Sequence, residues 1–203
     1  MALPRQSIDA SVREFLAALS SADAPHGSVA AAALAGGLGT ALLVMVTAFP
    51  KTRSDSATDR QALLEAGTAL SGLQAQLIET IETETVVKLY AARGLPQSSA
   101  SERIERDARI QLALRAGADV PLEVMRLCAT SLQQAQIVAE RCSRATAAEV
   151  QLGVGLIHAA FSGARSNLEM RLTSLTDLAH TKADMEEITR LSEIPADAVR
   201  AAE

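Results

Sequence analysis

Aromatic residues are almost absent from this sequence. Of its 203 residues only 2% are aromatic: three Phe, one Tyr and no Trp. Hydrophobic residues nevertheless make up 48% of the chain, so its core must be built from Ala, Leu, Val and Ile. Sheets favour β-branched and aromatic side chains, whereas small side chains let helices approach one another closely. The composition therefore favours packed helical layers, in a chain long enough for one sizeable core.

Several classes of function lack their usual signals. A net charge of −5 and the absence of a basic stripe argue against a nucleic-acid binder. There is no P-loop, no dinucleotide fingerprint and no His-x-x-x-His metal pair. Cys128 and Cys142 have neither metal nor redox spacing and are predicted to be free, buried thiols. The segment MALPRQSIDASVREF has no apolar core behind a basic region, so a cytoplasmic protein without a signal peptide is expected.

One long uncharged run stands out, from Val29 to Phe49. Its length suffices to span a bilayer. Its Ala and Gly residues contribute little insertion energy, however, and the rest of the chain is amphipathic with no second span. We therefore expect a central helix buried in a soluble protein and no membrane partner. The alternative, a membrane-associated helical protein, would partition with membranes.

Most of the chain shows the periodicity of amphipathic helices. The clearest helix is predicted over about residues 57–80, from the spacing of Leu63, Ala66, Leu70, Leu73, Leu77 and Ile81. Pro50 and Pro121 are expected to end or interrupt helices, because proline lacks a backbone N–H. Further helices are predicted in residues 7–21 with Ser7 as cap, in 84–93, from Ser99 or Ser101 onward, and in 122–141, 146–171 and 182–191.

No run of alternating apolar and polar residues is convincing enough to predict a strand. We therefore predict an all-α fold: a single-domain antiparallel helical bundle over residues 1–203, with the Ala/Gly-rich helix buried at its centre. Long helices with broad Ala/Leu faces often bury part of that surface against another copy, so a homodimer is expected.

The turn before the uncharged helix, Pro25-His26-Gly27-Ser28, is a candidate anion or carbonyl site. Gly27, Ser28 and Val29 present backbone N–H groups that the helix itself cannot satisfy, with the positive end of the helix dipole behind them. In a simpler interpretation, Ser28 is an ordinary N-cap and Gly27 only supplies the turn. His158, by contrast, lies in an apolar helix and is predicted to be a core residue.

Two charged segments are further candidates. Glu79, Glu82 and Glu84 precede Leu95-Pro96, and one such carboxylate in an apolar pocket would serve as a general acid or base. Alternatively, these residues form a solvated face. The second segment places four arginines among apolar residues: Arg103, Arg106, Arg109 and Arg115. They either bind carboxylates through paired hydrogen bonds or form ion pairs with acidic neighbours along the helix.

These segments, in this order, resemble the cyclodeaminase/cyclohydrolase family. That family includes the cyclodeaminase domain of formiminotransferase-cyclodeaminase and the methenyltetrahydrofolate cyclohydrolases. The matching residues are Phe15-Leu16, Pro25-His26-Gly27-Ser28-Val29, Met45-Val46, Glu82 before Leu95-Pro96, Arg106, Ala108, Ile110-Gln111, Val120-Pro121-Leu122, Gly163-Ala164 and Asn167-Leu168. The chain departs from the family in a shorter turn that contains His26, in glutamate for aspartate at Glu82, and in lacking the late Gly-Asn and Ser-Asp pairs.

The resemblance implies an α-helical dimer that binds a reduced folate between helices and acts in one-carbon metabolism. The implied reaction is hydrolysis of 5,10-methenyltetrahydrofolate to the 10-formyl form, with Glu82 as the catalytic carboxylate and no metal. The implied substrate contacts are His26, Gly27, Ser28, Lys51, Arg53, Arg106, Gln111 and Asn167. Two alternatives stay open: a formiminotetrahydrofolate cyclodeaminase, and a diverged non-catalytic relative that binds a pterin or a partner enzyme.

Overall fold

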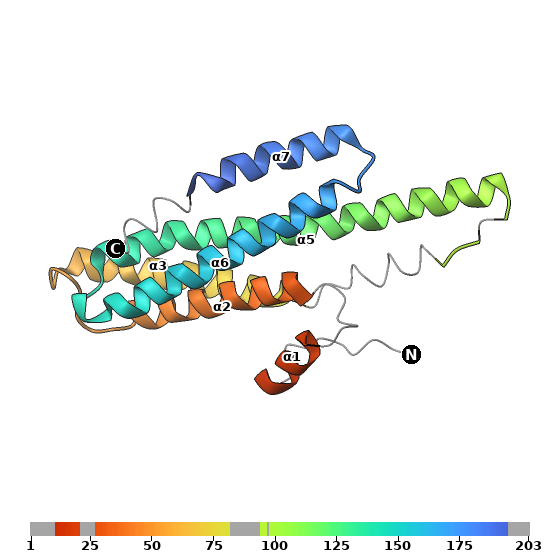
Figure 1. Cartoon of the computed structure of the whole chain (residues 1–203). Coiled ribbons are helices and arrows are strands. Elements are labelled where there is room, and N and C mark those ends of the chain that lie inside the picture. The colour runs from red at the N-terminus through yellow and green to blue at the C-terminus, as the bar shows by residue number, and fades with distance from the viewer. Residues whose placement is uncertain (1–10, 21–26, 82–93, 97, 195–203) are drawn as a thin grey trace.

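A computed structural model describes residues 11–20, 27–81, 94–96 and 98–194, and the statements below refer to these ranges. Its helices, in chain order, are α1 (Val12–Leu19), α2 (Gly27–Thr47), α3 (Ala57–Thr80), α5 (Ala100–Arg141), the 3₁₀ helix η1 (Arg144–Thr146), α6 (Ala147–Leu172) and α7 (Leu178–Ser192). Pairing of the β type within the described ranges is confined to an isolated antiparallel bridge between Thr52 and Cys142. The predicted all-α fold is confirmed (Figure 1).

Serine side chains cap both α1 and α5, but only the cap of α5 is one that the sequence predicts. Ser99 accepts a hydrogen bond from the backbone N–H of Glu102 at the start of α5, as one of the two predicted caps there. The cap of α1 is Ser11, which forms a reciprocal capping box with Glu14. The predicted cap Ser7 lies outside the described residues. The helix predicted over residues 84–93 also falls outside them.

Helix α2 packs closely against three neighbours. A Cβ at Gly36 would meet, within 3.4 Å, one side chain from each of α3, α5 and α6: Leu77, Cys128 and Ala160. At Gly39 a Cβ would lie 2.6 Å from the carbonyl oxygen of Gly153, so α2 and α6 touch almost backbone to backbone. The prediction of a buried, close-packed Ala/Gly helix is confirmed for this inner face.

Two of these neighbours, α3 and α6, run antiparallel to α2. Near the end of α2, Thr47 faces Gly67 of α3, whereas Gly36, further back along α2, faces Leu77. Along α6 the order is likewise reversed, because Gly39 faces Gly153 and Ala32 faces Gly163. The start of α2, the end of α3 and the end of α6 therefore meet at one end of the bundle.

The predicted interruption at Pro121 is wrong, since α5 runs without a break from Ala100 to Arg141. A proline inside a helix offers no N–H to the carbonyl four residues earlier, which here is that of Gly117. Nη1 of Arg171, on α6, donates a hydrogen bond to this oxygen over 2.7 Å. A neighbouring helix thus supplies the missing donor. Gly117 permits the approach, because a Cβ there would lie 2.8 Å from Nη1.

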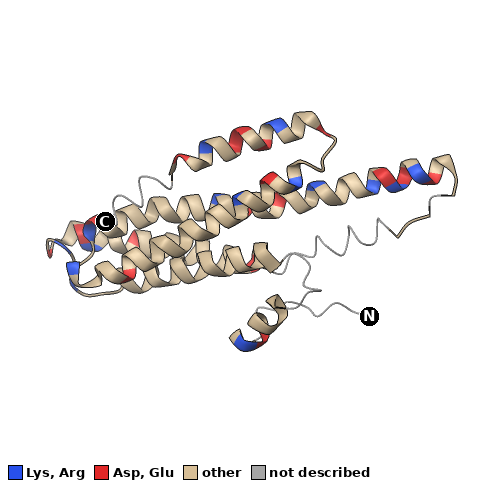
Figure 2. Cartoon of the chain, in the orientation of Figure 1, with Lys and Arg blue, Asp and Glu red and all other residues tan. Residues whose placement is uncertain are grey.

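Charged residues gather on α7, on the first turns of α5 and at the ends of the bundle, whereas α2 carries none (Figure 2). Helix α7 is tied to α5 by Arg126, whose Nε and Nη2 donate to the two carboxylate oxygens of Glu187 over 2.9 and 2.8 Å. Beside this pair, Nε2 of His180 lies 3.3 Å from Oδ2 of Asp184. Burial raises the pKa of the Asp184 carboxyl.

Both cysteines are free and buried, as predicted. Cys128 lies in the core between α2 and α5, and burial raises the pKa of its thiol to about 12. It is therefore a packing residue rather than a nucleophile.

Candidate functional site

Two of the predicted ligand residues meet at the start of α2. The hydroxyl of Ser28 donates a hydrogen bond to Oδ1 of Asn167 over 3.0 Å. Nδ2 of Asn167 donates in turn to the carbonyl oxygen of Gly163, also over 3.0 Å. The amide of Asn167 is thereby fixed between its own helix and the first turn of α2, with only 9% of the residue exposed.

Ser28 is not the N-cap that the simpler interpretation predicted. Helix α2 already begins at Gly27, so Ser28 lies within its first turn. The backbone N–H groups of this turn have no acceptor within the helix, and the helix dipole adds partial positive charge there. The start of α2 therefore keeps the properties expected of an anion or carbonyl contact.

The predicted catalytic carboxylate, Glu82, and the turn residue His26 lie outside the described residues. Their described neighbours in sequence lie at the end of the bundle that holds Ser28. Gly27 opens α2, and Ile81 is the C-cap of α3, with 7% of its surface exposed.

Lys51 and Arg53 lie at the other end of α2. This helix has 21 residues and is therefore about 30 Å long. Nη2 of Arg53 donates to the carbonyl oxygen of Ala139 over 2.8 Å, and its backbone N–H donates to that of Arg141, also over 2.8 Å. Arg53 thus holds the loop after α2 on the end of α5, and Lys51 is exposed. Within one chain, the structure does not bring these two residues to Ser28.

Gln111 has a structural partner at each end of its amide. Its Oε1 accepts from the backbone N–H of Thr176 over 3.1 Å, and its Nε2 lies 3.5 Å from the carbonyl oxygen of Ser174. Gln111 therefore anchors the turn between α6 and α7. A sequence pattern could not reveal this contact, because it joins residues more than sixty positions apart.

Among the arginines at the start of α5, Arg109 follows the surface-pairing alternative, whereas Arg115 lies 3.8 Å from Asp177, the cap of α7. Arg109 is 2.8 Å from Glu105 one turn earlier. Arg106, whose side chain is 24% exposed, has its Nη1 3.8 Å from Asp107. These residues lie on the part of α5 that extends beyond the other helices (Figure 1).

Sequence reasoning missed Arg171, one turn after Asn167 on α6. Its Nε is buried and has no hydrogen-bond partner, although Nη1 binds the Gly117 carbonyl. Burial lowers the pKa of this guanidinium, and it forms no ion pair with a carboxylate in the part of the chain that the structure describes. The only sequence signal for it is indirect: Pro121 leaves a carbonyl that needs a donor.

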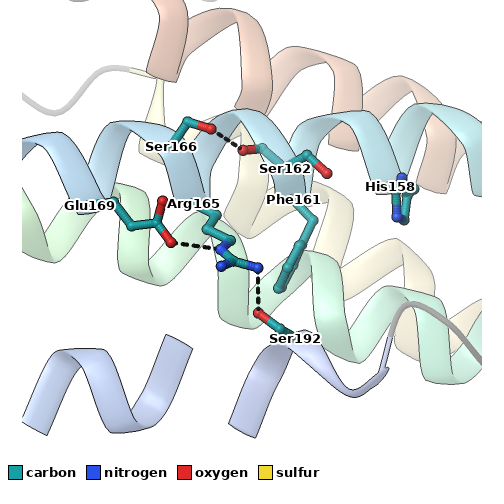
Figure 3. Close-up of a pocket in the computed structure, with 7 residues that line it drawn as sticks. All are labelled: His158, Phe161, Ser162, Arg165, Ser166, Glu169 and Ser192. Atoms are coloured by element: carbon teal, nitrogen blue, oxygen red, sulfur yellow. Dashed lines mark hydrogen bonds and ion pairs between the residues drawn. The ribbon is translucent and has the colours of Figure 1, made fainter. Parts of the chain in front are cut away.

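His158, predicted to be a core residue, is exposed instead. Its neighbours Ile157 and Phe161 point into the core, and the helical turn therefore rotates His158 away from it. It borders an open depression of about 350 Å³ between α6 and α7 (Figure 3), lined also by Phe161, Ser162, Arg165, Ser166, Glu169 and Ser192. Arg165 is already bound there to Glu169 over 2.7 Å, and none of the predicted ligand residues lines this depression.

The architecture defines the class of protein: a helical bundle built round an Ala/Gly-rich helix that begins at a Ser28–Asn167 contact. The chain belongs to the formiminotransferase-cyclodeaminase family, whose model matches residues 11–190. The predicted resemblance is thereby confirmed, and it extends from the cap of α1 into α7.

Two similar proteins support this assignment. A methenyltetrahydrofolate cyclohydrolase of Methylorubrum extorquens is 29% identical over 183 residues, which cover 89% of this chain and 88% of the relative. The crystal structure of formiminotetrahydrofolate cyclodeaminase from Thermotoga maritima has the same fold, with a TM-score of 0.83 and 20% identity. That match covers 96% of this chain and 94% of the other.

Proposed function

We propose that the protein is a methenyltetrahydrofolate cyclohydrolase that converts 5,10-methenyltetrahydrofolate and water into 10-formyltetrahydrofolate. The observation that carries the proposal is the similarity to the Methylorubrum cyclohydrolase, which extends over almost the whole of both chains. No metal is required, because the substrate carbon is already cationic. We also propose that the enzyme works in the cytoplasm, where its two thiols stay reduced.

The reaction needs a base and a stabiliser of positive charge. Water attacks the amidinium carbon between the two folate nitrogens, a C–O bond forms, and a proton leaves the water. The C–N5 bond then breaks, the remaining hydroxyl proton leaves the oxygen as the C=O bond forms, N5 takes up a proton, and the formyl group stays on N10. In this account Glu82 accepts the proton and stabilises the cation. The first-turn N–H groups of Gly27 and Ser28 contact an oxygen of the ligand.

The role of Glu82 predicts a large loss of turnover in Glu82→Gln, because the amide cannot accept the proton. We expect the rate of decay of the methenyl chromophore to fall about 100-fold or more, with the thermal unfolding midpoint little changed. Glu79→Gln is the matched control, because Glu79 is an exposed carboxylate near the end of α3, three positions before Glu82 in the sequence. Normal turnover in Glu82→Gln would remove Glu82 from the mechanism, and a loss confined to Glu79→Gln would move the role there.

We further propose that the protein is a homodimer, formed through the outer face of α2. This helix has no polar side to turn toward water: its mean hydropathy is 2.1, and by length and composition it could cross a membrane. Yet only 56% of its apolar window is buried within the chain. A helix that is hydrophobic all round requires cover on every side.

On its outer side, α2 carries an apolar stripe at helical spacing: Ala31 and Leu34 are partly exposed, and Leu38 and Met45 are exposed. Exposed Phe49, just beyond the helix, continues it. Leu38 and Met45 are 52% and 43% exposed. On the flanking helices, Leu64 of α3 and Leu152 of α6 are also exposed, at 52% and 57%. A second copy can present the same uncharged face across a twofold axis, so the surface is complementary to itself.

This proposal predicts that Leu38→Lys yields monomers, because a charge in the middle of the face would be buried without a partner. Light scattering should give twice the chain mass of 21.2 kDa for the wild type and the mass of one chain for the variant. The control is Leu112→Lys, because Leu112 is 69% exposed on α5 and lies outside the face. A monomeric wild type that instead sediments with lipid vesicles would overturn the dimer in favour of a membrane contact.

A further inference from the structure

The junction between α5 and α7 holds two titratable side chains that the proposed reaction does not use. Nε2 of His180 lies 3.3 Å from Oδ2 of Asp184, four residues later on α7. Both atoms are buried, and neither has a hydrogen-bond partner among the described residues. Only 8% of the Asp184 side chain is exposed, compared with 18% of the His180 side chain. The stability of an ionised Asp184 in this position therefore depends on the charges around it.

The arginines that reach α7 from the neighbouring helices are already bound to other groups. Arg126 of α5 contacts Glu187 over 2.8 Å and Glu123 over 3.3 Å. Arg165 of α6 binds an acidic residue of its own helix over 2.7 Å. Neither arginine is therefore available to form an ion pair with Asp184.

The remaining charges near Asp184 favour its neutral form. Burial is the largest cause that raises the pKa of its carboxyl, and the negative charges of Asp119 on α5 and Glu187 on α7 act in the same direction. His180 acts in the opposite direction. A buried carboxylate without a donor or a free cation favours the uptake of a proton.

His180 has an acidic neighbour of its own. Asp177, the N-cap of α7, accepts a hydrogen bond from the backbone N–H of His180 and is stabilised by the charge of the imidazole. Arg115 of α5 lies 3.8 Å from Asp177. A positive charge on His180 is therefore flanked by two carboxylates, those of Asp177 and Asp184.

We infer that the His180–Asp184 pair is a proton-dependent contact, which strengthens the docking of α7 when it takes up one proton. Without this proton the pair carries a net negative charge among acidic neighbours, and with the proton on either residue it is neutral. Water solvates both side chains when α7 is undocked, so the docked state binds the proton more tightly. Docking is therefore strongest at low pH and weakens as the pH rises through the apparent pKa of the docked pair.

The docking of α7 controls access to surface that the bundle otherwise covers. Ile188 and Leu191 of α7 are buried against the core. Ser192, at the end of α7, lines the depression of about 350 Å³ that also borders α6 (Figure 3). A rise in pH should therefore open this depression and uncover apolar surface.

The test follows amide hydrogen exchange of α7 between about pH 8 and pH 5, corrected for the intrinsic exchange rate. This range lies above the ordinary pKa of 4.5 of Glu187, so Glu187 stays ionised throughout. We expect the opening equilibrium of α7 in the wild type to fall about threefold or more toward pH 5. The same opening equilibrium at both ends of the range would overturn the inference.

Two variants assign the response to the pair. Asp184→Asn should remove most of it and should open less than the wild type at the alkaline end, because no buried carboxylate is left. His180→Gln should move the response to lower pH, because only the carboxyl then takes up the proton. Glu186→Gln is the matched control, with an exposed carboxylate on the same helix, and should respond as the wild type does.

Either variant can contradict the assignment. A full response in Asp184→Asn would overturn the inference. If α7 fails to dock in that variant, His180→Gln decides alone, and a response at an unchanged pH would overturn the inference.

Discussion

At the scale of single residues, the bundle depends on side chains that are small enough to let helices touch. Gly39 and Gly153 face each other, and a Cβ at Gly39 would lie 2.6 Å from both the Gly153 carbonyl oxygen and Cγ1 of Ile157. Neither neighbour can give way cheaply, because one is helix backbone and the other is a fully buried side chain. This contact fixes the distance between α2 and α6, and hence the Ser28–Asn167 contact at their end.

Gly39→Ala should therefore destabilise the protein by about 1–3 kcal/mol, as expected for overpacking in a close-packed core. Urea unfolding measures the change. Gly72→Ala on α3 is the control, because a Cβ there meets nothing within 4 Å. Alanine suits a helix better than glycine, so this variant should gain about 0.5–1 kcal/mol. Two variants of equal stability would show that the α2–α6 contact is looser than the structure indicates.

At the scale of elements, α7 is held to the bundle by charged contacts as well as by the buried side chains of Ile188 and Leu191. Arg126 binds Glu187, which also contacts Arg190 over 3.3 Å. The hydrogen bonds of Arg126 hold the pKa of the Glu187 carboxyl below its ordinary value of 4.5. A carboxyl whose pKa is lower in the folded state stabilises that state above its ordinary pKa and loses the effect as the pH falls through the lowered one.

Glu187→Gln should therefore weaken the docking of α7 at pH 7 but not in strong acid. We expect amide hydrogens of α7 to exchange roughly fivefold faster in the variant at pH 7, equivalent to about 1 kcal/mol. The difference should shrink as the pH falls below 4 and Glu187 of the wild type is protonated. Glu186→Gln is the control, because Glu186 is 70% exposed and its nearest cation, Lys182, is 3.8 Å away. A difference that persists in acid would show that Glu187 acts by packing alone.

At the scale of the whole molecule, the sequence predicts the helices well and their long-range contacts poorly. Apolar spacing located α3 and most of α5, α6 and α7, because each helix buries one side against the core. The break expected at Pro121 failed because the compensating donor, Arg171, lies fifty residues further on. Arg53 and Gln111 likewise bind partners that no local pattern reveals.

The candidate site was also predicted only in part, because local sequence patterns do not reveal contacts between residues far apart in the chain. The N–H groups at the start of α2 follow from the turn and the helix that it begins, and the family resemblance added Asn167, which the structure joins to Ser28. The resemblance also implied Lys51 as a substrate contact, yet a helix about 30 Å long separates it from Ser28 within the chain. Arg171 was missed because its role depends on the carbonyl that Pro121 leaves unpaired.

The measurement that tests the account most directly is the decay of the 5,10-methenyltetrahydrofolate chromophore in the presence of purified wild-type protein. The account predicts a rate above that of buffer, proportional to protein concentration, with 10-formyltetrahydrofolate as product. A folded protein that leaves the rate at the buffer value would contradict the cyclohydrolase assignment. The chain would then be a family member that binds a pterin or a partner without catalysing the reaction.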